Sequence, residues 1–495
     1  MSDILVEKIN EAQVRVTCQE ESTQRELYDY FTFEEPGAKY SEHYRKKRWD
    51  GKTHLLHKRY GTLPSGLVLY VQLFAKENNY TVEVAPELEV MNNFSLKEAQ
   101  DITAIALAGT RLKARDYQIL GFTKAIRYKK IVLVSPTASG KSLMMYLISR
   151  YLLANDCKRG LIVVPNINLV EQLYSDFRDY GWDVENNVQR IYEGHSRYLS
   201  KRLVISTWQS IYDMEEAGFF TEFDFVIGDE AHTFKAASLK KLMGNLVNAR
   251  YRIGTTGTLD DFKIHRLKIE GHFGPVSHIT TTKALIAAGH VSDLFIKCLI
   301  LGHPEHARVP RTYAEEMDYL ARCKKRNDFI KNLALSLKGN TLILIQFIEK
   351  HGDVLYEMIA QKVGEGRQVF YVHGGTEGEQ RESIRRIVET EKDAIIVASY
   401  GVYSTGVNIR NLHNIIFASP SKSKIRVLQS IGRGLRLGTD KTSATLYDIS
   451  DDFRKKSYVN HTLKHYLERI GIYEKEGFKV SKYLVDLKYD SKHDV

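Results

Sequence analysis

The chain has 495 residues, of which 43% are hydrophobic and 27% charged, and its formal net charge is +10. This is the composition of an ordinary globular protein, and no apolar run approaches the roughly 20 residues of a membrane span. The polar N-terminus lacks a secretory signal, and four isolated cysteines without a CxxC pair exclude a disulfide framework or a zinc knuckle. We therefore expect a cytoplasmic protein of about three domains with no membrane partner. The positive charge favours nucleic acid as a partner.

Residues 1–95 are expected to form a separate small α+β domain. A strand is predicted over residues 14–18, and a helix with a capping-type start is predicted after Ser22. Alternating apolar residues in LVLYVQLF and YTVEVA, within residues 66–85, predict two further strands with a turn at Asn78 and Asn79.

The segment over residues 39–61 of this domain is strongly basic, and aromatic residues lie among its cations. Cations neutralise phosphates while aromatic faces stack on bases, so the segment is a candidate nucleic-acid-binding surface. A solvated charged hairpin whose aromatic residues belong to the core is the alternative. The candidate contacts are Lys46, Lys47, Arg48 and Trp49.

A phosphate-binding loop is predicted after the buried strand at residues 131–134, and the other chemical motifs follow from it. The loop SPTASGKS ends in Gly-Lys-Ser and opens onto a helix over residues 143–153. Lys141 is expected to reach the β- and γ-phosphates, and Ser142 to bind Mg²⁺. Ser135 and Ala138 stand where Gly is common in this pattern. The predicted phosphate-binding residues are Ser135, Pro136, Thr137, Ala138, Ser139, Gly140, Lys141 and Ser142.

Gln118 precedes the loop by about one helix, within the string RDYQ at residues 115–118. Its side-chain amide offers a donor and an acceptor that can read an adenine edge. A helix cap is the alternative role for this residue.

Apolar runs at residues 160–165, 203–207, 225–229 and 252–257 predict strands of one parallel sheet joined by crossover helices. Functional residues are expected where such strands end. Asp229 is placed to hold Mg²⁺ through water, and Glu230 to orient or deprotonate an attacking water. Acids after a buried strand also occur as helix caps.

The same pattern recurs from residue 281, where five runs predict a second parallel sheet: residues 342–346, 369–372, 394–399, 415–418 and 444–449. In the element QSIGRGLR, Arg433 and Arg436 are three residues apart and therefore share one helix face. In a chain that binds a triphosphate, such arginines can stabilise the charge that develops in phosphoryl transfer. Residues 451–495 predict a helical extension packed against this domain. A basic face toward DNA, with Arg454, Lys455, Lys456 and Lys464, is the alternative.

Seven segments occur in the order of the motifs of superfamily 2 DEAH-type helicases and translocases, and the chain resembles this family. They are SPTASGKS, VVPNINLVEQ, ISTWQS, GDEAH, TTGT, SYGVYSTGVN and QSIGRGLR. Over its whole length, RWDGK included, the chain resembles the recombination helicases of T-even-type bacteriophages. The resemblance implies an α/β fold with two tandem RecA-like domains, at residues 96–280 and 281–450, with ATP and Mg²⁺ between them.

The resemblance also implies roles for single residues. Asp229 and Glu230 act on metal and water, Gln429 lies near the γ-phosphate, and Arg433 and Arg436 complete the site. Thr405 and Asn408 stand where many relatives have Arg and Asp, so they receive no role. Residues implied to couple hydrolysis to movement are His232, Thr256 and Thr258. Residues implied to lie along the nucleic-acid backbone are Pro165, Gln172, Thr207 and Gln209.

The implied activity is ATP-dependent remodelling of branched DNA by a monomer in the host bacterial cytoplasm. The implied reactions are junction migration, fork reversal and unwinding of D-loops and R-loops, including RNA–DNA hybrids. They serve recombination, repair and replication. Recombination proteins or single-strand-binding proteins are expected partners. A translocase without strand separation, an RNA helicase, and a DNA-binding or annealing protein with a vestigial ATP site are the alternatives.

Overall fold

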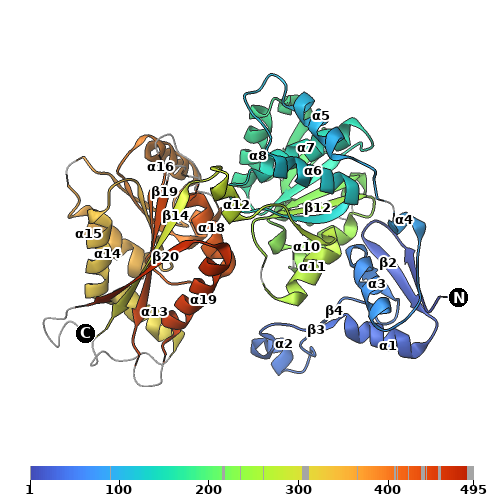
Figure 1. Cartoon of the computed structure of the whole chain (residues 1–495), viewed down its shortest axis with the longest axis horizontal. Helices are drawn as coiled ribbons and strands as arrows, with labels where there is room; N and C mark the ends of the chain where they lie inside the picture. Colours follow the sequence, from blue (N-terminus) through green and yellow to red (C-terminus); the bar gives the residue numbers. More distant parts are fainter. Residues whose placement is uncertain are drawn as a thin grey trace. The chain divides into compact units, whose positions relative to one another are not determined.

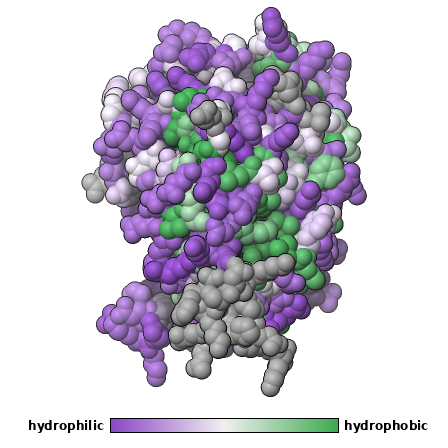
Figure 2. Space-filling view, turned by 90° about the vertical axis from the view of Figure 1, so that its left-hand side faces the viewer, coloured by the Kyte–Doolittle hydropathy of each residue, from purple (hydrophilic) through white to green (hydrophobic). Residues whose placement is uncertain are grey.

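The chain forms two compact units (Figure 1): the first comprises Met1–Ser135 and Gly140–Thr280, and the second comprises Thr281–Val495 together with Pro136–Ser139 of the phosphate loop. The structure, a computed structural model, describes residues 2–89, 91–214, 218–234, 236–259, 261–303, 312–364, 366–405, 409, 411–421, 423–435, 441, 443–454 and 459–487. Among these residues no helix is long and apolar enough to cross a membrane. Figure 2 shows a face that is mostly hydrophilic, with hydrophobic groups gathered in small patches.

The first unit begins with a four-stranded sheet in the order β5-β2-β1-β6. Its strands are β1 (Ile4–Lys8), β2 (Gln13–Cys18), β5 (Thr62–Pro64) and β6 (Val82–Val84). β2 confirms the predicted strand at residues 14–18. Helix α1 (Glu21–Tyr30) begins before Ser22, and its N-cap residue Glu20 makes no side-chain capping bond, so the predicted capped start is wrong.

The predicted strand LVLYVQLF is also wrong, because this run forms helix α3 (Val68–Glu77). Leu67, Val71 and Phe74 stand at positions i, i+4 and i+7 and are all buried in one core with β1 and β2. A nearly continuous apolar run satisfies helix and strand spacing equally, so packing against the sheet decides between them.

The basic segment lies on an arm, residues 35–51, between strands β3 (Thr32–Glu34) and β4 (Lys52–His54), which pair antiparallel. The arm contains the short helices η1 (Ala38–Tyr40) and α2 (Glu42–Arg45). The side chains of Tyr40 and Tyr44 are 75% and 42% exposed, which contradicts the alternative that these aromatic residues belong to the core.

The central sheet of the first unit has seven strands in the order β13-β7-β12-β11-β8-β10-β9, and every neighbouring pair is parallel. All four predicted runs and the strand before the phosphate loop are present. The strands are β7 (Lys130–Val134), β8 (Gly160–Val164), β9 (Val188–Ile191), β10 (Leu203–Thr207), β11 (Phe225–Asp229), β12 (Tyr251–Thr256) and β13 (Val276–His278).

Helices cover both faces of this sheet (Figure 1). Ile131 and Leu133 of β7 pack with one group of helices: α5 (Leu96–Ala106), α6 (Asp116–Tyr128), α7 (Lys141–Ala154) and α8 (Ile167–Asp179). Val132 and Val134 point to the opposite face, where they pack with α10 (Ala237–Asn245) and α11 (Lys263–Phe273). Strands buried on both faces appear in a sequence as continuous apolar runs, which is why these were predicted.

The second unit is built on another seven-stranded parallel sheet, in the order β16-β17-β15-β18-β19-β14-β20. The five predicted strands are confirmed as β15 (Thr341–Ile345), β16 (Val369–Val372), β17 (Ile395–Ser399), β18 (Asn414–Phe417) and β19 (Ser443–Asp452). The sequence did not predict β14 (Asp293–Gly302). The α/β fold class with two parallel-sheet units and a small N-terminal domain is confirmed.

The C-terminal extension contains the predicted helix, α19 (His461–Glu476), which buries Leu463, Tyr466 and Ile470. It is not wholly helical, because β20 (Lys479–Asp486) follows and pairs with β14 at the edge of the sheet. Of the cations in the DNA-facing alternative, Arg454 forms an ion pair with Asp452, and Lys455 and Lys456 lie outside the described residues.

Two histidines buried in the sheet units make stability sensitive to acid. Burial and the charge of Arg252 lower the pKa of His272 to about 3, and burial beside Arg326 does the same for His351. Below pH 6.5 the unfolded chain binds protons that the folded chain excludes, so stability falls as pH falls toward 3. We expect each histidine to contribute a loss of about 1.4 kcal/mol between pH 7.5 and 5.5.

Urea unfolding at the two pH values checks this expectation for the first unit. His272→Gln is expected to reduce the loss of unfolding free energy between the two pH values by about 1.4 kcal/mol. The control His43→Gln, at an exposed site, should leave this loss unchanged. An unaltered pH dependence in His272→Gln would contradict the assignment.

Candidate functional site

The phosphate-binding loop, the acidic segment and the coupling segment predicted from the sequence converge at one edge of the first sheet. β7, β12 and β11 are neighbours, and parallel strands present their carboxyl ends at the same edge. Ser135 follows β7, Thr256 ends β12, and Asp229 ends β11 in register with Thr255. The topology therefore brings SPTASGKS, TTGT and GDEAH together.

The phosphate loop forms a cradle suited to an anion. Its first residue continues the sheet, because the Ser135 N–H donates to the Thr256 carbonyl oxygen at 2.9 Å. Lys141 is the first residue of α7, a 14-residue helix, and its Nζ donates to the Ser135 carbonyl oxygen at 3.4 Å. A lysine ammonium and the N–H groups of a helix N-terminus together attract phosphate oxygens.

Two loop residues adopt left-handed backbone conformations. Gly140 has φ +78°, a conformation that favours glycine, and a Cβ there would lie 2.4 Å from Gln118 Nε2, so the Gln118 amide would have to shift. Ala138 has φ +68°. A non-glycine residue in this region costs about 1–2 kcal/mol, and such strain is typical of functional loops.

The Gln118 side chain is engaged within the chain. Its Oε1 accepts from the Arg115 N–H at 2.9 Å, and its Nε2 donates to the Gly140 carbonyl oxygen at 3.3 Å. The first bond supports the capping alternative at the start of α6. The second joins α6 to the phosphate loop, and the adenine contact stays a prediction.

Ser142 and Asp229 carry side-chain oxygens of the kind that Mg²⁺ prefers. Burial and the neighbouring Glu230 charge raise the pKa of Asp229 to about 6, against the opposing effects of Lys141 and of the bond that Thr255 donates to Asp229 at 2.8 Å. Two adjacent carboxylates, of which Asp229 is buried and Glu230 half-buried, are donors that suit a hard cation. Among the described residues no group of three or more His, Cys, Asp or Glu side chains could hold a metal ion.

Tyr180 and Thr255 are site residues that the sequence analysis missed. The hydroxyl of Tyr180, at the end of α8, lies 2.7 Å from Ser142 Oγ. No sequence signal marks Tyr180. Thr255 stood within the quoted TTGT segment, but its contact with Asp229 depends on the register between β11 and β12.

The three residues expected to couple hydrolysis to movement lie together. His232 Nδ1 is 3.3 Å from Glu230 Oε2 and 3.0 Å from Thr256 Oγ1. Thr256 Oγ1 donates in turn to the Thr258 carbonyl oxygen at 2.9 Å. A continuous polar chain therefore links the acidic segment to the segment after β12.

The residues expected along nucleic acid lie farther along the same sheet edge. Pro165 follows β8 and Thr207 ends β10, the two strands beyond β11. Gln209 is exposed, and Gln172 lies half-buried on α8. Nucleotide-binding and nucleic-acid candidates thus occupy separate halves of one edge.

The base of the basic arm is fixed to α11 of the same unit. Glu35 Oε2 accepts from Lys268 Nζ at 2.7 Å and from Thr53 Oγ1 at 2.5 Å, and His265 lies 3.8 Å from its other oxygen. Although partial burial alone raises the pKa of Glu35, the bonds from Lys268 and Thr53 hold it below its ordinary value. The base of the arm is therefore held by charged side chains of α11, a helix that packs on one face of the seven-stranded sheet.

The remainder of the N-terminal domain packs tightly against the same helix. Leu267 of α11 belongs to the N-terminal hydrophobic core. A Cβ on Gly66 would lie 1.9 Å from the Glu270 carbonyl oxygen, and the Tyr70 hydroxyl donates to the buried Glu270 carboxylate. Lys130 of β7 donates to the Glu11 carbonyl oxygen at 2.9 Å.

On the arm itself, Lys46, Lys47 and Arg48 are exposed. Trp49 is half-buried, and its Nε1 donates to the Lys52 carbonyl oxygen at 2.8 Å. The cations are thus accessible to a polyanion, while the indole also supports the fold of the arm.

In the second unit the arginine element lies at the end of a helix. Helix α18 (Lys424–Gly434) carries Gln429, which is half-buried, and the backbone of Arg433. Helix α18 ends at Gly434, so Arg433 stands in its last turn. Arg436 and Asn408 lie outside the described residues, and Thr405 ends α17 (Tyr400–Thr405).

Three family profiles match successive parts of the chain. "DNA helicase UvsW, N-terminal" matches residues 3–85, "Type III restriction enzyme, res subunit" matches residues 111–261, and "Helicase conserved C-terminal domain" matches residues 324–438.

Whole-chain similarities agree with these matches. The chain is 32% identical to the ATP-dependent DNA helicase uvsW of Enterobacteria phage T4, over 98% of this chain and 100% of that protein. The crystal structure of T4 UvsW matches with a TM-score of 0.52 at 30% identity, over 98% of this chain and 100% of that one. The DNA 3'-5' translocase XPB2 of Sulfurisphaera tokodaii is 25% identical over 71% of this chain and 83% of its own length.

Proposed function

This chain belongs to the UvsW family of ATP-dependent DNA helicases, and from that premise we propose that it remodels branched DNA. The proposed reactions are junction migration, fork reversal and unwinding of D-loops and R-loops. The observation that carries the proposal is a basic arm anchored directly to an ATP-binding motor sheet, because such an arm can hold a branch point while the motor moves a strand.

In the first unit, Lys141 and the N–H groups of the phosphate loop bind the phosphates of ATP. Ser142 and Asp229 would hold a Mg²⁺ ion, whose chemistry there would be to neutralise charge on phosphate oxygens. Glu230 orients the attacking water and accepts its proton. Its position beside His232 then connects the acid to Thr256 and Thr258, the residues we propose as the coupling segment.

In the second unit, Gln429, Arg433 and Arg436 supply groups that act on the same phosphates. An arginine guanidinium stabilises the negative charge that develops on the transferred phosphoryl group. Hydrolysis followed by release of phosphate removes the γ-phosphate, so these groups lose their binding partner and the grip on the strand changes.

The test of this function is ATP hydrolysis measured with branched DNA, linear duplex, single-stranded DNA and RNA, together with strand displacement on the same substrates. Branched DNA is expected to stimulate most and to be unwound. Stimulation without strand displacement would instead indicate a translocase, greater stimulation by RNA an RNA helicase, and hydrolysis no greater than in Lys141→Ala a binding protein with a vestigial site.

Removing the charge of the arm tests its proposed role in DNA binding. The triple variant Lys46→Ala, Lys47→Ala, Arg48→Ala is expected to weaken branched-DNA binding by about tenfold or more at moderate salt, because three phosphate contacts are lost. ATP affinity should not change. Fluorescence anisotropy with a labelled junction, repeated over a salt series, measures both the affinity and the reduced salt slope.

The matched control removes three exposed lysines elsewhere, Lys362→Ala, Lys392→Ala and Lys475→Ala, and so changes net charge equally. If both triple variants weakened DNA binding equally, the effect would be one of net charge alone, and the proposed role of the arm in DNA binding would be contradicted. These variants are a sharper test than deletion of residues 1–95, because that deletion would uncover Leu267 and leave the buried Glu270 without Tyr70.

A further inference from the structure

Four residues that follow β18, in the segment leading to α18, are buried, although loops usually lie at the surface. They are Ala418, Ser419, Pro420 and Ser421, and we refer to them as the 418–421 linker. A buried loop must find partners for its backbone carbonyl groups. In this linker, side chains from three other elements provide them.

Two buried arginines hold the linker from opposite faces of the second sheet. Arg326, on α14 (Lys324–Ser336), donates to the Ala418 carbonyl oxygen at 2.8 Å. Arg469, on α19, donates to the Ser421 carbonyl oxygen at 3.3 Å. Both guanidinium groups are essentially inaccessible to solvent.

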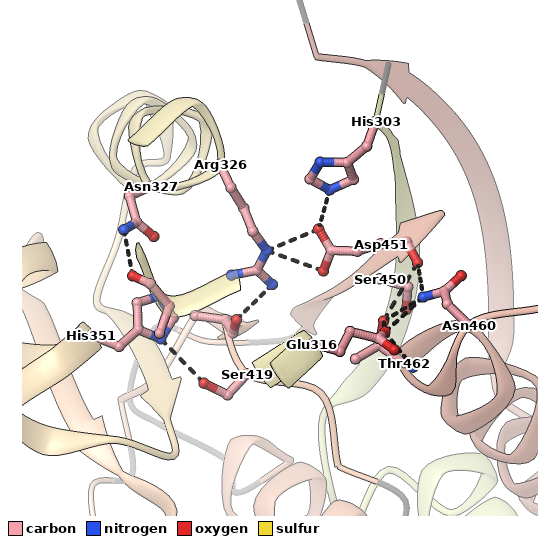
Figure 3. Close-up of polar contacts among 12 residues, drawn as sticks. His303, Glu316, Arg326, Asn327, His351, Ser419, Ser450, Asp451, Asn460 and Thr462 are labelled. Atoms are coloured by element: carbon pink, nitrogen blue, oxygen red, sulfur yellow. Dashed lines mark hydrogen bonds and ion pairs between the residues drawn. The ribbon is translucent and has the colours of Figure 1, made fainter. Parts of the chain in front are cut away.

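Aspartates of β19 fix both arginines. Arg326 Nε donates to both oxygens of Asp451, at 2.9 and 3.0 Å, in the cluster shown in Figure 3. Arg469 donates to both oxygens of Asp448, at 2.8 and 2.6 Å. Asp451 lies an odd number of residues from Asp448, and alternation along a strand therefore directs the two side chains to opposite faces. Buried charges of this kind are stable only when paired and hydrogen-bonded, so each arginine has a single well-defined position.

Ser419 connects the linker to two further segments. Its Oγ accepts from the Gln346 N–H at 3.1 Å and lies 3.2 Å from His351 Nδ1 (Figure 3). Its carbonyl oxygen accepts from the Tyr400 hydroxyl at 2.9 Å. Tyr400 is the first residue of α17, within the stretch SYGVYSTGVN that resembles a helicase motif.

We propose that Tyr400, Arg326 and Arg469 are positioning residues that fix the start of α18 and thereby the place of Gln429 and Arg433. The inference rests on the proposed function, in which these two residues act on the phosphates of ATP. Because Tyr400 lies in a helicase-motif segment and bonds to the linker, the same contact also transmits movement of α17 to α18. A helix displaced by about 1 Å at a catalytic site is enough to reduce turnover strongly.

Two tyrosines offer a matched pair of variants. Tyr400→Phe removes only the hydroxyl that reaches the linker. Tyr174→Phe removes the hydroxyl of another buried tyrosine, on α8 of the first unit, which donates to Glu185 Oε1 at 2.7 Å and belongs neither to the linker nor to its arginines. Each change deletes one tyrosine hydrogen bond without changing side-chain shape, so both should lower thermal stability by a similar small amount.

The readouts are kcat and KM for nucleic-acid-stimulated ATP hydrolysis, with thermal melting as the structural control. Tyr400→Phe is expected to lower kcat by about tenfold while KM for ATP changes by less than about twofold. Tyr174→Phe should change neither constant by more than about twofold. Arg469→Lys, which keeps the charge but loses the forked geometry, should lower kcat in the same direction as Tyr400→Phe.

Equal kcat values in Tyr400→Phe and Tyr174→Phe would overturn the inference, whether or not Arg469→Lys folds. Failure of the proposed function gives a different result, because then the unaltered protein itself shows no hydrolysis stimulated by nucleic acid. The two outcomes are therefore separable in one set of assays.

Discussion

Glu230→Gln is expected to lower ATP hydrolysis by about a thousandfold, because the amide cannot accept the proton of the attacking water. Glu230 has φ +50° at the end of β11, a conformation that directs it away from the strand and beside His232. Nucleotide binding should persist, since the phosphate cradle is formed by other residues. Single-turnover hydrolysis and equilibrium binding of a fluorescent ATP analogue measure the two effects separately.

The isosteric control Glu193→Gln removes an exposed carboxylate from the same unit and should leave hydrolysis unchanged. If Glu230→Gln retained a tenth or more of the normal rate, another group would have to accept the proton. Asp229 is the neighbouring candidate, but its proposed role is to hold the cation. An Asp229→Asn variant measured alongside would distinguish these assignments through its Mg²⁺ dependence.

Lys141→Ala is expected to abolish hydrolysis and, unlike Glu230→Gln, to weaken nucleotide binding by about a hundredfold. The reason is that Lys141 supplies the ammonium group at the start of α7, and charge-assisted bonds to phosphate contribute about 1.5–3 kcal/mol each. Isothermal titration with ADP and with a non-hydrolysable ATP analogue checks this difference. Affinity for the two should converge in the variant if Lys141 reaches the terminal phosphates.

Lys158→Ala, an exposed lysine of the same unit, is the control for the loss of one charge. Unchanged nucleotide affinity in Lys141→Ala would contradict the assignment of the phosphate loop to the nucleotide-binding site. DNA binding by Lys141→Ala in the absence of nucleotide should remain normal, because the basic arm lies on another part of the first unit.

The sequence predicted the two parallel sheets well, for a reason that particular strands illustrate. β8 and β11 are buried on both faces, so each is a short continuous apolar run ended by a polar residue. β20, by contrast, lies at a sheet edge and carries lysines and exposed side chains, so no regular spacing of apolar residues distinguishes it from a loop. The helix α3 was mistaken for a strand because its apolar run fits either period.

The residues of the candidate site also fall into those that the sequence predicts and those that only the tertiary structure reveals. The sequence by itself determined the phosphate loop, the acidic pair and the segment after β12, because their chemistry requires particular residues within a few positions of one another. The tertiary structure alone decided which side chains support them. Tyr180 reaches Ser142, and Tyr400 and Arg469 reach the 418–421 linker, across 38, 19 and 48 residues of sequence. Contacts across such separations depend on strand order and register, which no local spacing in the chain encodes.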